Sequence, residues 1–267
     1  MPLIRIDCLH GSSSAFFNAL VNILMKNTYM NVAGKYNNIL FISDLHAPYS
    51  HPDAYAFLKA IKEVLNPELV VSVGDEIDGH SWSFHRPSAD LMSPGDELKL
   101  AIQQLGFYYE LFPKMLLVDS NHGSLVYRKI KDAGLPMHVV KPYREVLNAP
   151  EGWSWHDDLV ITTKNDDKIY VCHGRSNNVL KESQLHGMNF CSGHHHSTFG
   201  INYWANREKL MWGMSVGCLV DQKSLAYEYA KNFSKKFIVG TGVLMNGQPR
   251  LLPMVLNENG RWVRKLV

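Results

Sequence analysis

Residues 69–78 have the sequence LVVSVGDEID, in which an apolar, β-branched run gives way to glycine and two aspartates. A short apolar run rich in valine is typical of a strand buried on both faces. Gly74-Asp75 is typical of the turn that ends such a strand. In open α/β sheets, the ligand-binding loops follow the carboxyl ends of the strands. The stretch therefore predicts a buried strand that carries acidic side chains to a functional site.

Four other segments have the same form, an apolar run followed by polar side chains. They are NILFISDLH (38–46), KMLLVDSNH (114–122), KIYVCHG (168–174) and NFCSGHHH (189–196). Together the five strand ends supply carboxylates, imidazoles and one amide, which suit first-row divalent ions better than calcium or structural zinc. Two such ions, held roughly 3.5–4 Å apart, can clamp a phosphate and acidify a bridging water. The pattern therefore predicts a two-metal site for phosphate-ester hydrolysis.

Each motif has a simpler interpretation when it is taken alone. Asp44-Leu45-His46 and Asn121-His122 would be ordinary strand-end loops, and Gly74-Asp75 a simple turn. The histidine run 194–196 resembles part of a tag, but tags sit at termini and this run is internal. Six of the thirteen histidines fall inside the motifs, as expected if they are ligands. Five motifs in this order favour a single metal site over five unrelated loops.

The five motifs together resemble the calcineurin-like metallophosphoesterase superfamily, whose pattern is D-x-H, G-D-x-x-D, G-N-H-(D/E), H and G-H-x-H. The resemblance covers about residues 38–200. It implies two divalent ions, with manganese expected first and iron, zinc or nickel compatible with the same donors. The implied ligands are Asp44, His46 and His196 for one ion, Asn121, His173 and His194 for the other, and Asp75 shared between them.

The resemblance also implies roles for two residues that do not bind metal. His122 would be the general acid or a transition-state stabiliser, and Asp78 would orient an imidazole. His195 occupies the variable position of the last motif. Gly123 stands where the family pattern has a carboxylate that often steers the catalytic histidine, and Asp78 is the candidate replacement. This departure, and the lack of arginine in GDEIDG, argue against the serine/threonine protein phosphatase branch.

The predicted elements alternate between strand and helix and then become mostly strands. Helices are expected over 53–65, 97–112, 124–132 and 179–187, hairpin turns at MNGQP and NENGR, and irregular structure over 79–97 and 134–158. This order favours an α/β fold, a two-sheet β-sandwich core flanked by helices, which is the four-layer fold that the resemblance implies. Residues 36–267 are predicted to form one domain, after an N-terminal extension or helix over 1–35.

Composition narrows the class of protein. The 46% hydrophobic share permits a sizeable core, and the net charge of +2 by itself favours no class of binding partner. Residues 201–267 carry ten Lys/Arg and four Asp/Glu, a basic surplus that either attracts a polyanion or forms a solvated face. The four cysteines form no CxxC pair, which favours a reducing compartment, and we expect the cytoplasm. No apolar stretch is long enough for a membrane span, so no membrane association is expected.

The substrate is the least determined feature. Loop 79–97 holds Trp82, Phe84 and Arg86, which are candidates to stack a base and grip a phosphate, or else to pack the loop. Arg175, two residues after His173, is a further candidate phosphate ligand. We expect a phosphodiesterase or nuclease acting on nucleic acid or nucleotides. A phosphomonoesterase and a non-catalytic scaffold of the same fold are the alternatives, and the oligomeric state is left open.

Overall fold

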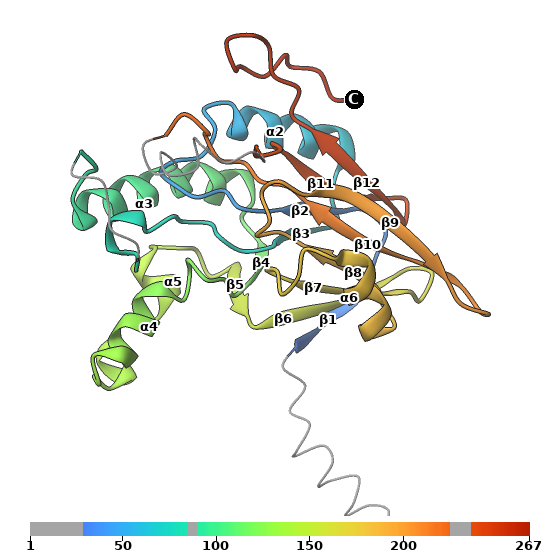
Figure 1. The fold of residues 1–267 in the computed structure, drawn as a ribbon, viewed down its shortest axis with the longest axis horizontal. Coiled ribbons are helices and arrows are strands. Elements are labelled where there is room, and N and C mark those ends of the chain that lie inside the picture. The colour runs from blue at the N-terminus through green and yellow to red at the C-terminus, as the bar shows by residue number, and fades with distance from the viewer. Residues whose placement is uncertain (1–28, 85–89, 225–235) are drawn as a thin grey trace, which may run out of the picture.

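The computed structural model describes residues 29–84, 90–224 and 236–267, which form two stacked six-stranded sheets with helices outside them (Figure 1). Sheet 1 has the strand order β1 (Tyr29–Tyr36), β6 (Asp158–Thr163), β7 (Lys168–Cys172), β8 (Asn189–Ser192), β10 (Leu210–Val216) and β9 (Phe199–Ala205). Sheet 2 has the order β12 (Gln248–Pro253), β11 (Gly240–Met245), β2 (Ile39–Ile42), β3 (Leu69–Ser72), β4 (Met115–Val118) and β5 (Trp153–His156). The predicted α/β sandwich is confirmed.

The main core lies between the two sheets. Phe41, Val71 and Val118 of sheet 2 pack with Ile169 and Met214 of sheet 1, all fully buried. The apolar runs that precede the motifs are therefore strands covered on both faces, which explains why they are continuously apolar rather than alternating. Strands β2 to β5 are mutually parallel, so their carboxyl ends meet at one edge.

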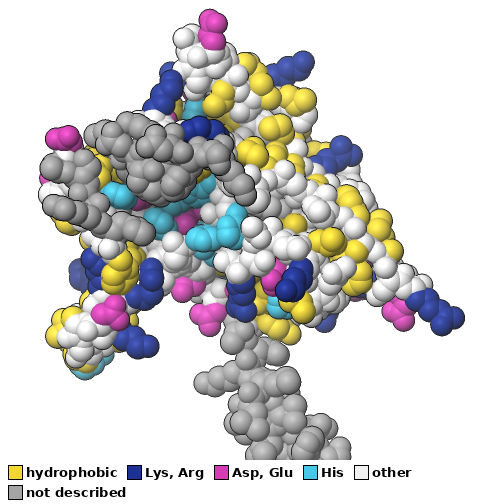
Figure 2. Space-filling view, viewed as in Figure 1, with side chains coloured by type: hydrophobic (Ala, Val, Ile, Leu, Met, Phe, Trp, Pro, Cys, Tyr) yellow, Lys and Arg dark blue, Asp and Glu magenta, His cyan; other side chains and the backbone are white. Residues whose placement is uncertain are grey.

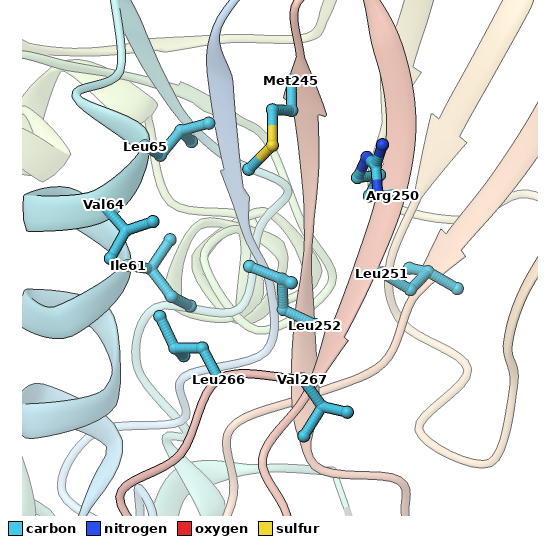
Figure 3. A pocket seen from close by; sticks show the side chains of 9 residues that line it. All are labelled: Ile61, Val64, Leu65, Met245, Arg250, Leu251, Leu252, Leu266 and Val267. Atoms are coloured by element: carbon cyan, nitrogen blue, oxygen red, sulfur yellow. The ribbon is translucent and has the colours of Figure 1, made fainter.

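Helices form the two outer layers. The long helices α2 (Ala54–Leu65) and α3 (Pro94–Leu111) cover sheet 2, and their apolar faces share one core cluster with it. Helix α6 (Val179–His186) covers β8 and β10 of sheet 1. The shorter elements are η1 (His80–Trp82), α4 (Leu125–Asp132), η2 (Met137–Val139) and α5 (Tyr143–Val146). A groove of about 420 Å³ lies between α2, β11, β12 and the C-terminal Leu266 and Val267, away from the motif loops (Figure 3).

Three boundaries differ from the sequence prediction. Strand β1 begins at Tyr29 and pairs with β6, so the sheet starts before the predicted boundary at residue 36. This strand lies at the sheet edge and buries only Val32, so no apolar run marks it. Strand β5 lies inside the segment predicted to be irregular, and α3 begins at Pro94 instead of residue 97, after the Ser93 cap. Residues 1–28 lie outside the described part of the chain.

The hairpin prediction for MNGQP is confirmed. Asn246 and Gly247 both have positive φ and join β11 to β12, as the tightest hairpin turns require.

In the described ranges, no helix is long and apolar enough to cross a membrane.

Candidate metal centre

The first two motifs form adjacent loops at the carboxyl ends of β2 and β3. The N–H of Asp44 donates to the carbonyl of Gly74 (3.1 Å), and the N–H of His46 donates to the carbonyl of Asp75 (2.8 Å). Asp44, His46 and Asp75 all have positive φ, near +50°. Left-handed backbone costs a non-glycine residue roughly 1–2 kcal/mol, and three such residues at one site are typical of a functional constraint. Backbone hydrogen bonds therefore hold the two loops together in a strained conformation.

Two glycines allow the loops from the two sheets to approach. Gly74 has φ +99°, and a Cβ there would lie 2.5 Å from Nδ1 of His173. A Cβ on Gly193 would lie 2.5 Å from Oδ2 of Asp44. Any side chain at these positions would push the histidines of sheet 1 away from the carboxylates of sheet 2. The glycines in motifs two and five are therefore required by distance and, at Gly74, also by conformation.

One cluster of donor atoms joins the first motif to the last. Nε2 of His196 lies 2.9 Å from Oδ1 of Asp44 and 3.2 Å from Nε2 of His46. Asp44 is completely buried, and His46 is 1% exposed. The three ligand atoms lie within 4.8 Å of one another, although His196 is 150 residues away from His46 in sequence.

A second cluster joins the middle motifs. Nε2 of His173 lies 2.8 Å from Oδ1 of Asn121 and 3.0 Å from Oδ2 of Asp75, and Nδ1 of His194 lies 3.2 Å from the same nitrogen. Asp75 also approaches the first cluster, since its Oδ2 lies 3.5 Å from Nε2 of His46. The structure therefore places all seven predicted ligands together, with the buried Asp75 carboxylate between the two clusters. Figure 2 shows histidine and acidic side chains gathered in a hollow of this face.

The donor set fits cations. Nδ1 of His173 lies 2.7 Å from the carbonyl oxygen of Val73, which accepts a hydrogen bond and so places the proton of the neutral ring on that nitrogen. Nε2 then presents a lone pair, yet it faces a carboxylate oxygen of Asp75 and the amide oxygen of Asn121. Three electron-pair donors that converge on one point repel one another unless a positive charge lies between them.

The pKa shifts of the buried groups also indicate a site that favours positive charge. Burial opposes the charged form of His46, but the hydrogen bonds that the charged ring donates to Asp44 and Asp78 outweigh it and raise the pKa of His46 to about 10. Burial likewise opposes charge on His173, while the Asp75 carboxylate raises its pKa to about 9. The pKa of Asp44 is lowered although burial acts against this, because His196 and His46 stabilise its carboxylate. The site thus stabilises positive charge, which protons or metal ions can supply.

Asp78 contacts two of the site histidines through different atoms. Its Oδ2 lies 2.8 Å from Nδ1 of His46, so this carboxylate fixes the ring and directs Nε2 toward the ligand cluster. Its backbone carbonyl oxygen accepts a short hydrogen bond from Nδ1 of His122. Nε2 of His122 then lies 3.9 Å from Oδ2 of Asp75, and the His122 side chain is 25% exposed. A main-chain oxygen thus steers His122, in the place of the carboxylate missing at Gly123.

Two buried glutamates that the sequence analysis did not single out support the loops. Glu76 is 3% exposed, accepts the indole N–H of Trp155 at 3.1 Å, and has its pKa raised by burial. Glu97 is completely buried and accepts the backbone N–H groups of His80 and Ser81, each at 2.9 Å. A glutamate in the first turn of a helix is ordinary, so no sequence signal marked Glu97 as the residue that holds the η1 loop.

The three predicted substrate residues that the structure describes have different surroundings. Trp82 is half-buried against the core cluster of α2 and α3, which favours its structural interpretation. The Arg175 guanidinium forms an ion pair with Asp158, and its role as a phosphate ligand stays a prediction. Phe84 is 55% exposed beside helix α4. Arg86 lies outside the described residues.

Trp82 and Phe84 should therefore behave differently on substitution. We expect Trp82→Ala to lower the free energy of unfolding by about 2 kcal/mol, less than the roughly 3–5 kcal/mol of a fully buried aromatic residue. Phe84→Ala should change it by no more than about 0.5 kcal/mol, because the ring is largely exposed. Urea denaturation of both variants measures this, and an unfolding free energy that Trp82→Ala leaves unchanged would contradict the packing role.

Three solved structures are similar to this chain over most of its length. Vps29 from Cryptosporidium parvum shares 14% identity, with 85% of this chain and 95% of that chain covered and a TM-score of 0.43. The phosphoesterase YfcE from E. coli shares 14% identity, with 86% and 98% covered and a TM-score of 0.42. Vps29 from Chaetomium thermophilum shares 12% identity, with 86% and 95% covered and a TM-score of 0.45. No curated protein matched the sequence.

The family comparison is more specific. Residues 38–234 match the model of the calcineurin-like phosphoesterases, and all five motifs lie inside this range. Because the match spans most of the chain, the protein belongs to the calcineurin-like phosphoesterase family.

Proposed function

We propose that this protein hydrolyses phosphodiesters of nucleic acid or nucleotides with two divalent metal ions. The position of Asp75 carries the proposal, because one buried carboxylate oxygen lies 3.5 Å from His46 and 3.0 Å from His173, which belong to different donor clusters. A carboxylate shared in this way is what a two-metal site needs. Asp44, His46 and His196 would hold one ion, Asn121, His173 and His194 the other, with Asp75 shared.

The protein's own residues would divide the remaining work. Bound divalent ions supply positive charge to phosphate oxygens and lower the pKa of a bound water. Asp78 keeps the His46 ring in its binding orientation. His122, held at Nδ1 by the carbonyl of Asp78, presents Nε2 to the cleft, where it can give a proton to the leaving oxygen. Its side chain is only 25% exposed, so this proton is partly shielded from water.

The choice of a diester over a monoester depends on the surface next to the ligands. Helix α4 begins three residues after His122 and carries Arg128 and Lys129. A diester within a nucleic acid has further phosphates for these cations to bind, whereas a monoester ends at the phosphate that the metals hold. The proposed compartment is the cytoplasm, in keeping with the free and buried Cys172, Cys191 and Cys218.

The direct test is a pair of chromogenic substrates with manganese. We expect kcat/KM for bis-p-nitrophenyl phosphate to exceed that for p-nitrophenyl phosphate. A higher value for the monoester would favour a phosphomonoesterase. Metal binding without turnover of either substrate, or of an oligonucleotide, would favour a scaffold.

Metal content tests the two-ion arrangement separately. The seven ligand positions, one of which is the shared carboxylate, predict a saturating ratio of two manganese ions per chain. Elemental analysis of protein stripped with a chelator and reloaded with manganese measures this ratio, and iron, zinc and nickel can be loaded in the same way. A saturating ratio of one or zero would contradict the shared site.

A further inference from the structure

We propose that Phe84, Arg128 and Lys129 form a binding platform for single-stranded nucleic acid beside the metal centre. This inference rests on the proposed function and names the substrate class that the site would take. The three residues come from the end of the η1 loop and from helix α4, and the sequence analysis singled out only Phe84. We call them the α4 platform.

The geometry joins the platform to the metal centre. The guanidinium of Arg128 lies 5.3 Å from the centre of the Phe84 ring, and Nζ of Lys129 lies 5.2 Å from it. Nη2 of Arg128 also donates to the backbone carbonyl of Asn121, at 2.6 Å. Asn121 contributes the amide oxygen of the second donor cluster. A phosphate bound by Arg128 would therefore lie close to the phosphate that the metals hold.

No described carboxylate balances the charges of the platform. In the ranges that the structure describes, neither Arg128 nor Lys129 pairs with a carboxylate. Residues 124–145 contain five Lys/Arg and only two Asp/Glu. Two neighbouring cations on one ring repel each other, and the ring offsets only part of that cost. A bound polyanion would relieve the repulsion, and Figure 2 shows basic side chains on the surface over α4, below the histidine hollow.

The exposed aromatic ring favours a ligand that can stack on it, which a simple anion cannot do. Phe84 is 55% exposed although it is a large apolar side chain, so much of its surface is available to a ligand. Base stacking on an exposed aromatic, together with cations along the backbone, is how proteins bind single strands without sequence preference. A duplex keeps its bases stacked inside and offers only phosphates. The combination therefore favours an unpaired strand.

Binding to metal-free protein tests the platform without hydrolysis. The probe is a fluorescein-labelled oligothymidine, measured by anisotropy at several salt concentrations with the full chain after chelator treatment. We expect Phe84→Leu to weaken binding about tenfold, and Phe84→Trp to restore it, because stacking needs an aromatic face. Lys129→Gln should weaken binding and reduce the salt slope by about 0.7, the value for one phosphate contact on a single strand.

Lys131→Gln is the matched control, because it removes the same charge from the same helix, two residues away from Lys129. It should leave the affinity and the salt slope close to those of the unmodified protein. Equal losses in Lys129→Gln and Lys131→Gln would overturn the platform, since general attraction would then explain binding. Equal affinity for a duplex of the same length would also overturn it.

Failure of this inference can be told apart from failure of the proposed function. If oligothymidine does not bind but bis-p-nitrophenyl phosphate is hydrolysed with manganese, the α4 platform is wrong and the phosphodiesterase stands. If oligothymidine binds as expected but no phosphate ester is hydrolysed, the platform stands and the catalytic proposal is wrong. In active protein, Phe84→Leu should lower kcat/KM for the oligonucleotide about tenfold more than for bis-p-nitrophenyl phosphate.

Discussion

Asp75→Asn is expected to remove at least one metal ion and nearly all turnover. The Asp75 carboxylate is buried and lies between the two donor clusters, so the variant loses a negative charge that both ions would share. The loss of metal and activity should exceed that of Asp78→Asn, which changes only the hydrogen-bond partner of the His46 ring. Changing such a partner usually lowers metal affinity or activity roughly 10–100-fold. Elemental analysis and steady-state rates with manganese measure both effects.

His195→Ala is the matched control for the Asp75 variant. His195 lies between His194 and His196 in the last motif, but its ring belongs to none of the donor groups found among the described residues. We expect the variant to retain two ions per chain. Equal metal loss in the two variants would show that the assignment of ligands along residues 194–196 is wrong.

The second large effect is expected for His122→Asn. This variant should retain both ions and lose about 10²–10⁴-fold in rate, the range typical of general acid catalysis. The reason is geometric: the His122 ring is fixed by the Asp78 carbonyl, and its Nε2 lies 3.9 Å from Asp75, outside both ligand clusters. The loss should shrink for substrates with good leaving groups, because these need less protonation.

A series of aryl phosphodiesters with graded leaving-group pKa measures this dependence. In the unmodified protein the rate should vary little with leaving group, and in His122→Asn it should fall steeply as the leaving group becomes more basic. A His122 variant depleted of metal, or one that is fully active on poor leaving groups, would contradict the role as acid.

The site and the sheet core could be predicted from the sequence because their determinants are local. Each motif follows an apolar run within a few residues, and parallel strands bring such loops to one edge whatever the rest of the chain does. Local sequence signals also predicted helix α2 and the turn at Asn246-Gly247, each to within a residue or two of its observed position. The family resemblance is confirmed by the match over residues 38–234.

Edge elements and loop contacts could not be predicted in this way. Strand β1 buries only Val32, and its place in sheet 1 depends on pairing with β6, more than 120 residues later. The role of Glu97 depends on the η1 backbone folding back over the start of α3. Neither feature produces an apolar period in the sequence, because the partners are backbone groups or polar side chains.

The sequence by itself therefore predicted the strands that precede the motifs, the meeting of the motif side chains and the family, because residue type and strand-end position suffice for them. Only the tertiary structure decided which side chains are available to a substrate. It packed the half-buried Trp82 against the core, paired Arg175 with Asp158 and placed two cations of α4 beside the exposed ring of Phe84. It also assigned the support of His122 to the Asp78 carbonyl, a main-chain atom that every residue type carries and that no sequence pattern can therefore mark.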